Sequence, residues 1–419
     1  MIILATILSG LSFLPSVLFL IHPRSPLGWV AWFPKLTAAG LSPIWAIMGA
    51  VGAVLGWAYH ALWAIPMGIF GAGMMIGYVW RCTQDHNGLE NAFGAGWSDQ
   101  IPPEQDRLMV QKRWTLFLKM KASPEPSWER DIPFWTIPGT DRQLLCDVWR
   151  PGNGDVSGLA FVYFHGGAWF LGDKDTLTRP FFHHLVAQGH TVMDVAYRLC
   201  PEVELHGMVG DVKRAIAWMK ANASRYGVDP RKIVSGGASA GGHLALLAGY
   251  TPQHPELTPE DVKSADLSVS GIISYYGPTD LLAAYHHMNL QQLAGLPPVP
   301  IGKDLDYTKS WRDGGRFDAL LGGWPEDAPS MYQLASPITH VHPGCLPTLL
   351  IQGNQDVVTS LDATRALYRK LVESGVPAIN VVFPWTAHAF DALVPHINPA
   401  AQSALYDVDR FLALLANKD

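Results

Sequence analysis

The chain has 419 residues, which is enough for one large domain and an additional module. Its net charge is −6 and it has no basic cluster, so we expect no nucleic-acid partner. The hydrophobic share of 48% is high for a water-soluble enzyme. The scattered cysteines Cys82, Cys146, Cys200 and Cys345 lack disulfide or metal spacing and are predicted to be free thiols.

The first 80 residues are the most apolar part of the chain. They contain no Asp or Glu, and their only Lys and Arg residues are Arg24 and Lys35. Residues 1–21 are uncharged, and this length is close to the ~20 residues that a helix needs to span a bilayer. The alternative of a cleaved signal peptide is not favoured, because this run has no basic leader and no A-x-A cleavage site.

A second apolar run, residues 43–80, is too long for one span. As a single helix it would extend ~57 Å, against a hydrocarbon core of ~30 Å, so it predicts a hairpin that turns near His60. A buried helical hairpin is the alternative. The expected all-α transmembrane domain, residues 1–82, therefore has about three spans, at 1–21, 43–59 and 62–80.

Small and charged residues in this region suggest how the spans associate and orient. Glycines would let the hairpin arms approach closely and leave a homodimer open; they are Gly49, Gly52, Gly56, Gly68, Gly71, Gly73 and Gly77. Arg24, Lys35 and Arg81 fall on one side of the expected membrane. The positive-inside rule makes that side, and the catalytic domain attached to it, cytoplasmic.

Residues 83–131 form a polar connector or cap, in which one amphipathic helix is expected at 103–121. The remainder, 132–419, begins with a hairpin and then alternates strands and helices, which favours a mostly parallel sheet covered by helices on both faces. The strands are expected near 159–164, 191–196, 232–236, 269–276, 347–352 and 379–383.

The exception is an insertion at 281–344, which has no strand signal and is expected to form a cap. His286, His287, His340 and His342 lie in it without acidic or thiolate neighbours, so we expect no metal site there.

Gly237-Ala-Ser-Ala-Gly241 lies between an apolar strand and a helix. A sharp strand–turn–helix connection presents its central serine at the carboxyl edge of the sheet, so Ser239 is the candidate nucleophile. A serine-rich loop with small neighbours is the alternative. Upstream, a strand enters His165-Gly166-Gly167, whose backbone amides can be aimed at a developing oxyanion.

Asp356 and His388 follow later strands and complete the order nucleophile, acid, base. Asp362 and Asp391 are competing candidates for the acid.

Residues 131–419 resemble α/β-hydrolases of the hormone-sensitive-lipase-like and feruloyl-esterase-like group. The matching segments are His165–Trp169, Tyr197–Glu202, Gly237–His243, Gly353–Asp356 and His388–Phe390. The resemblance implies an eight-stranded α/β-hydrolase fold with a Ser239–His388–Asp356 triad, an oxyanion hole from Gly166, Gly167 and Ala240, and no cofactor. Ala168 departs from the family pattern, since many relatives carry a third glycine there.

The expected function is a membrane-anchored serine hydrolase that cleaves carboxylic esters through an acyl-enzyme. Small-molecule esters and membrane lipid are the expected partners. An acyltransferase or amidase that uses the same residues stays open, because the sequence does not say which acceptor reaches the acyl group. A non-catalytic scaffold is disfavoured by the intact set of three residues.

Overall fold

The computed structural model describes residues 1–22, 27–120, 126–152, 156–292 and 316–418. Its centre is an eight-stranded sheet with the order β1-β2-β4-β3-β5-β6-β7-β8, in which β1, β2 and β4 pair antiparallel and the other neighbours pair parallel. The strands are β1 Ser127–Thr136, β2 Gln143–Arg150, β3 Ala160–Phe164, β4 Thr191–Val195, β5 Ile233–Ala238, β6 Gly271–Tyr275, β7 Thr348–Gly353 and β8 Ala378–Phe383. The predicted hairpin and mostly parallel sheet are confirmed.

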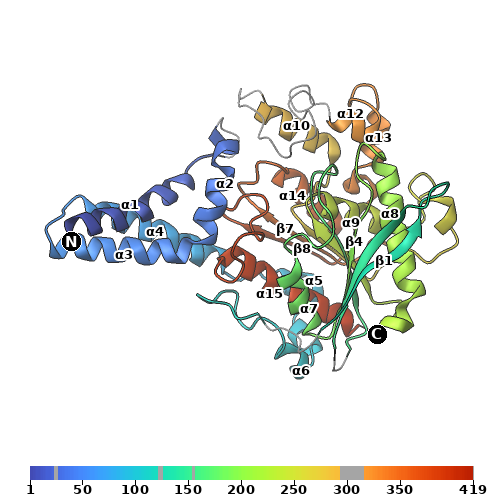
Figure 1. Cartoon of the computed structure of the whole chain (residues 1–419), viewed down its shortest axis with the longest axis horizontal. Coiled ribbons are helices and arrows are strands. Elements are labelled where there is room, and N and C mark those ends of the chain that lie inside the picture. The colour runs from blue at the N-terminus through green and yellow to red at the C-terminus, as the bar shows by residue number, and fades with distance from the viewer. Residues whose placement is uncertain (23–26, 121–125, 153–155, 293–315, 419) are drawn as a thin grey trace.

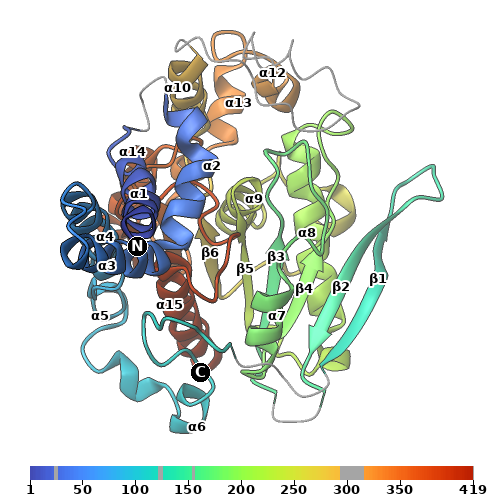
Figure 2. The ribbon, with the colours of Figure 1, turned by 60° about the vertical axis from the view of Figure 1, so that its left-hand side comes forward.

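Helices cover both faces of the sheet (Figure 2), because side chains alternate between the two faces along each strand. On one face, Val162 and Ile233 belong to a core shared with α8, α9 and α14. On the other, Phe161 and Val234 belong to a core shared with α7 and α15. These helices are α7 Arg179–Val186, α8 Leu205–Ala221, α9 Ala240–Tyr250, α14 Leu361–Glu373 and α15 Pro399–Ala416, and the 3-10 turns η2 Ala223–Tyr226 and η3 Glu260–Val262 lie between them.

The described parts of the 281–344 insertion contain short helices joined by turns, and residues 293–315 lie outside the described structure. The elements are α10 Leu281–Gln292, α12 Arg316–Leu321, α13 Pro329–Leu334 and η4 Pro337–His340. Their aromatic side chains form a cluster with Trp169 of the loop after β3. The Phe317 ring packs edge-on against the rings of Trp169 and Tyr285, with centroids 6.2 and 5.8 Å apart. The insertion therefore covers the loop that follows β3.

Four helices precede the sheet: α1 Ile2–Leu18, α2 Leu27–Gly40, α3 Ser42–Ala58 and α4 Ala64–Cys82. Figure 1 shows α1, α3 and α4 side by side as a bundle that projects away from the sheet, with α2 lying between the bundle and the sheet domain. The predicted turn at His60 is present, with a φ of 58°. Helix α2 lies between the first two predicted spans, 1–21 and 43–59, where no helix was predicted. Arg24 lies outside the described residues.

The interior of this bundle is built from serine and glycine. A Cβ on Gly49 would lie 2.4 Å from Ser12 Oγ, and one on Gly52 would lie 2.5 Å from Ser9 Oγ. Ser9 and Ser12 are fully buried. Gly73 and Gly77 face open space, so the expectation that they line the helix contacts is wrong. The helices of the bundle therefore approach closely through only one face of each hairpin arm, α3 and α4.

The outer face of the bundle is apolar. Ile3, Leu14 and Trp57 are 75%, 66% and 75% exposed, and Val54 and Ile69 are similarly open. Among the described residues, no helix taken singly is both long and apolar enough to cross a bilayer. The bent pair α2 and α3, which meet at 75°, passes that criterion when taken together.

The connector contains the short helices α5 Gly88–Phe93 and α6 Pro103–Asp106 and the turn η1 Trp97–Gln100. The predicted helix at 103–121 is wrong beyond its first turn, and its last residue lies outside the described structure. The amides of this segment bond to α15 instead: Val110 N–H donates to Asp409, and Thr115 N–H donates to Gln402. Side-chain acceptors on α15 replace the i−4 carbonyls that a helix would use.

Cys82, Cys146, Cys200 and Cys345 are free and buried.

Candidate active site

Ser239 sits between β5 and α9 in a strained turn, with φ 53° and ψ −120°. The flanking glycines are required by contact distances. A Cβ on Gly237 would lie 2.3 Å from the Phe164 carbonyl oxygen, and one on Gly241 would lie 1.9 Å from the same atom. No real Cβ tolerates such distances, so only glycine lets β3, β5 and α9 meet here. Strain of this kind is common at functional sites.

The structure brings the three residues predicted from chain order into one hydrogen-bonded row. His388 Nε2 lies 3.0 Å from Ser239 Oγ, and His388 Nδ1 lies 2.8 Å from Asp356 Oδ2. Asp356 follows β7, and His388 lies in the loop between β8 and α15. The carboxyl ends of parallel strands meet at one edge of the sheet, which is why residues so distant in sequence converge.

Asp356 is nearly fully buried, and each of its oxygens has partners. Oδ1 accepts the amides of Val358 and Thr359 at 2.7 and 2.8 Å. Oδ2 accepts the Thr359 hydroxyl at 2.8 Å in addition to His388. These donors hold the carboxylate plane toward the imidazole, so Nδ1–H can donate in one orientation.

The two competing carboxylates are placed differently. Asp391 is half-buried, and the desolvation of its carboxyl group raises its pKa; it accepts a 2.6 Å hydrogen bond from the Tyr276 hydroxyl. The Tyr276 ring lies 4.4 Å from the His388 ring, so Asp391 is linked to the imidazole through this tyrosine. Asp362 is exposed in the first turn of α14 and lies 3.9 Å from Arg365. Neither has the hydrogen bond to His388 that Asp356 has.

The loop after β3 runs beside the serine. A Cβ on Gly166 would lie 3.3 Å from Ser239 Cβ, and Gly167 has a φ of 131° that L residues rarely adopt. Ala168 takes a left-handed φ of 52° without being glycine. Ala240 supplies the first residue of α9. The amides of Gly166, Gly167 and Ala240 therefore belong to the backbone segments that flank Ser239.

Two histidines brace this loop. His165 Nδ1–H donates to the Gly166 carbonyl at 2.7 Å and its ring stacks on Tyr197; burial lowers its pKa. His243 Nδ1 accepts from Trp169 Nε1 at 3.1 Å, while its Nε2–H donates to the Ala335 carbonyl at 2.8 Å. His243 thus ties the loop to the insertion. The sequence predicted no role for His243, although His243 lies two residues after the serine motif Gly237–Gly241.

Arg198 and Glu202, which lie in the family-matching segment Tyr197–Glu202, form ion pairs with residues other than Ser239, His388 and Asp356. Arg198 donates to both oxygens of Asp211, at 2.8 and 2.7 Å, and Glu202 pairs with the exposed Arg142 at 2.7 Å. The sequence reasoning missed the residues of α2 that contact the site. Trp32 and Lys35 reach the loops carrying His388 and Asp356, and no local pattern around them indicates it.

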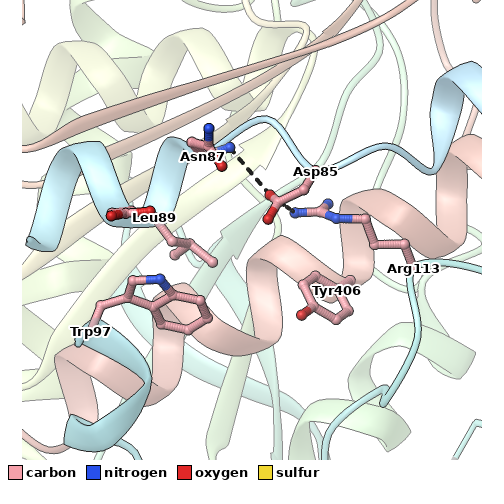
Figure 3. Close-up of a pocket in the computed structure, with 7 residues that line it drawn as sticks. Asp85, Asn87, Leu89, Trp97, Arg113 and Tyr406 are labelled. Atoms are coloured by element: carbon pink, nitrogen blue, oxygen red, sulfur yellow. Dashed lines mark hydrogen bonds and ion pairs between the residues drawn. The ribbon is translucent and has the colours of Figure 1, made fainter. Parts of the chain in front are cut away.

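A separate small pocket lies where the connector contacts α15 (Figure 3). Its lining includes Asp85, Trp97, Arg113 and Tyr406. Arg113 donates to both oxygens of Asp407, at 2.9 and 3.0 Å, so its charge is engaged in joining the connector to α15. In the part of the chain that the structure describes, no group of three or more His, Cys, Asp or Glu side chains could hold a metal ion.

Comparison with known proteins places this arrangement in a family. The BD-FAE family model matches residues 146–371, which is more than half of the chain; the match begins within β2 and ends within α14. The chain belongs to the BD-FAE family. The match contains Ser239 and Asp356 and ends before His388.

Individual relatives are named as esterases. The chain is 32% identical to the probable carboxylic ester hydrolase LipM of Mycobacterium tuberculosis over 64% of its own length and 57% of LipM. It is 28% identical to the esterase LipQ of the same organism, over 73% of this chain and 69% of LipQ. The chain thus spans about 57–69% of these relatives. The propionate-bound thermophilic esterase of Thermogutta terrifontis superposes with a TM-score of 0.53 at 25% identity, over 69% of this chain and 95% of that one.

Proposed function

We propose that this protein is a serine hydrolase that cleaves carboxylic esters through an acyl-enzyme. The observation that carries the proposal is the continuous row of hydrogen bonds from Ser239 Oγ through His388 to Asp356. Acyl transfer needs a base in hydrogen-bond contact with both the nucleophile and the orienting acid, and His388 makes these two contacts at 3.0 and 2.8 Å. The named relatives add support, since they are esterases and the Thermogutta enzyme holds propionate, a carboxylic acid of the product class.

In the proposed reaction Ser239 Oγ attacks the ester carbonyl carbon while its proton passes to His388 Nε2. The carbonyl oxygen becomes an oxyanion, which the amides of Gly166, Gly167 and Ala240 stabilise. The carbon–oxygen bond to the alcohol then breaks, and the His388 imidazolium gives its proton to the leaving alkoxide. Water repeats the sequence on the acyl-enzyme and releases the carboxylic acid.

The test is Ser239→Ala in the full-length protein, assayed with a p-nitrophenyl ester and with a fluorophosphonate probe read by intact mass. Removing the nucleophile of such a triad lowers kcat by ~10⁶-fold, so neither turnover nor labelling is expected. Thermal unfolding should match that of the unsubstituted protein. Substantial turnover by the variant, or labelling at another residue, would overturn the assignment of Ser239.

We further propose that the α1–α3–α4 bundle inserts into a bilayer. The distribution of its residues supports this, because Ser9, Ser12 and glycines fill the interior while large apolar side chains point outward. A water-soluble bundle has the opposite arrangement, whereas small residues at helix contacts and apolar exteriors are typical of membrane helices. Helices of 17 to 19 residues are ~26–29 Å long, near the ~30 Å core, and local thinning accommodates the difference.

The orientation proposed is a cytoplasmic catalytic domain. Arg81 lies at the end of α4 nearest the sheet, and its guanidinium carbon is 4.6 Å from the centroid of the Trp385 ring. One of the positive charges used in the positive-inside rule is therefore at the end of the bundle that joins the catalytic domain. Carbonate extraction of membranes from cells expressing the full chain tests insertion, and protease protection in inverted vesicles tests orientation. Recovery in the carbonate supernatant would refute insertion, and protection inside inverted vesicles would refute the orientation.

A further inference from the structure

We infer that α2 is part of the active site: Trp32 and Lys35 are positioning residues that hold the loops carrying His388 and Asp356. This inference rests on the proposed function and adds to it, since a helix of the apolar N-terminal region then does more than attach the enzyme to a surface. Trp32 and Lys35 are three residues apart and lie one turn from each other on the same face of α2.

Trp32 contacts the base from two directions. Its Nε1–H donates to the His388 backbone carbonyl at 2.9 Å. Its ring meets the imidazole ring edge-on, with centroids 6.0 Å apart. The hydrogen bond restrains the main chain of His388 and the ring contact restrains its side chain. Both contacts join residues that are 356 positions apart in the chain.

Lys35 contacts the acid loop. Its Nζ donates to Gln355 Oε1 at 2.7 Å and also to the Ile21 carbonyl. Gln355 directly precedes Asp356, and its own Nε2–H donates to the Phe19 carbonyl at 2.9 Å. Lys35 is 1% exposed, and burial lowers its pKa to about 8. A buried cation that donates to the amide oxygen beside the acid fixes the position of that amide.

The His388 loop is in need of outside support. Trp385 and Ala389 both have left-handed φ values, of 54° and 59°, although neither is glycine. Such backbone conformations are strained in residues other than glycine, and they persist where surrounding contacts determine them. Those contacts come from the N-terminal region. The Phe19 ring stacks on the Trp385 ring with centroids 5.9 Å apart, and the Tyr78 hydroxyl oxygen lies 3.1 Å from the Thr386 hydroxyl oxygen.

The core is continuous across this junction. Phe19, Leu36 and Tyr78 belong to the same buried cluster as Ile351 of β7 and Phe383 of β8. A chain shortened to begin near Asp85 would therefore lose the packing against the catalytic loops together with the bundle. Such a truncation cannot separate attachment to a membrane from positioning, so point substitutions are needed.

The experiment compares Trp32→Phe and Trp32→Ala in the full-length protein with Trp114→Phe. Trp114 is a matched control, because its Nε1–H also donates to a backbone carbonyl, that of Ile397, at 2.9 Å. kcat and KM are measured with a short p-nitrophenyl ester, the labelling rate with a fluorophosphonate, and thermal unfolding in the same detergent. Ser239→Ala serves as the inactive reference.

Trp32→Phe removes one hydrogen bond and keeps a ring, so kcat and the labelling rate should fall about 3- to 10-fold. Trp32→Ala removes both contacts, and displacement of a catalytic group by ~1 Å costs about 100-fold. KM should stay unchanged in both, and Trp114→Phe should keep full activity. The positioning role would be overturned by any one of three results. These are an unchanged kcat in Trp32→Ala, a Trp32 variant in which only KM rises, and a fall of kcat in Trp114→Phe equal to that in Trp32→Phe. If the unsubstituted protein neither turns over the ester nor reacts with the probe, the proposed function fails, and this inference fails with it.

Discussion

Asp356→Asn isolates the role of the buried carboxylate with almost no change in volume. In the unsubstituted protein Oδ1 accepts two amides and Oδ2 faces both the Thr359 hydroxyl and His388 Nδ1. The asparagine oxygen will take the Oδ1 position, because the amides of Val358 and Thr359 need an acceptor. Its NH₂ group then points at His388 Nδ1.

An NH₂ donor facing Nδ1 favours the imidazole tautomer with its proton on Nε2. Nε2 lies 3.0 Å from Ser239 Oγ and, once protonated, cannot accept the serine proton. In a serine protease the same substitution lowers kcat by ~10⁴-fold, which is ~5.5 kcal/mol of transition-state stabilisation. We expect a loss of this size here, with thermal unfolding nearly unchanged because every hydrogen bond of the side chain has a replacement partner.

The assay is kcat for a p-nitrophenyl ester near pH 7, with Asp362→Asn and Asp391→Asn as controls of identical chemistry. Asp362→Asn should be fully active, because Asp362 is exposed on α14. Asp391→Asn should lose less than Asp356→Asn, because Asp391 reaches the site through Tyr276. Activity of Asp356→Asn within tenfold of the unsubstituted protein, or a larger loss at Asp391, would refute the reasoning.

Two further predictions concern stability. Burial lowers the pKa of His243 from 6.5 to about 4, so an unfolded chain binds a proton that the folded chain excludes between these values. The free energy of unfolding should therefore fall by about 3 kcal/mol from this group as the pH is lowered from 6.5 to 4. Chemical unfolding of His243→Gln should show a shallower fall of this free energy with pH. Equal slopes for the two proteins would contradict the role given to His243. In the bundle, Gly49→Ala should lower the melting temperature because its Cβ would meet Ser12 Oγ at 2.4 Å, whereas Gly73→Ala, which meets nothing within 4 Å, should raise it or leave it unchanged. An unchanged melting temperature in Gly49→Ala would show that α1 and α3 can move apart to accommodate the added Cβ.

The strands and the serine turn could be predicted from the sequence, because their signals are local. Apolar runs bounded by glycine and proline indicate strands, and the glycines at 237 and 241 mark the place where the backbones of β3, β5 and α9 meet. The order of Ser239, Asp356 and His388 was sufficient to predict that they converge, since the carboxyl ends of parallel strands share one edge.

The connector shows where local signals failed. Its amphipathic spacing at 103–121 predicted a helix, yet acceptors on α15, such as Asp409 and Gln402, take the amides that a helix would have satisfied internally. Intrinsic helix preference is weak beside tertiary hydrogen bonds of this kind, so periodicity alone gave the wrong answer.

Only the tertiary structure decided what the apolar N-terminal region contacts. Hydropathy indicated helices there, but it could not say that α2 lies against His388 or that Lys35 is buried beside Gln355. Hydrophobic periodicity records which face of a helix is covered and not what covers it. A contact between residues 356 positions apart leaves no pattern in the sequence around either of them, because it depends on how every intervening element packs.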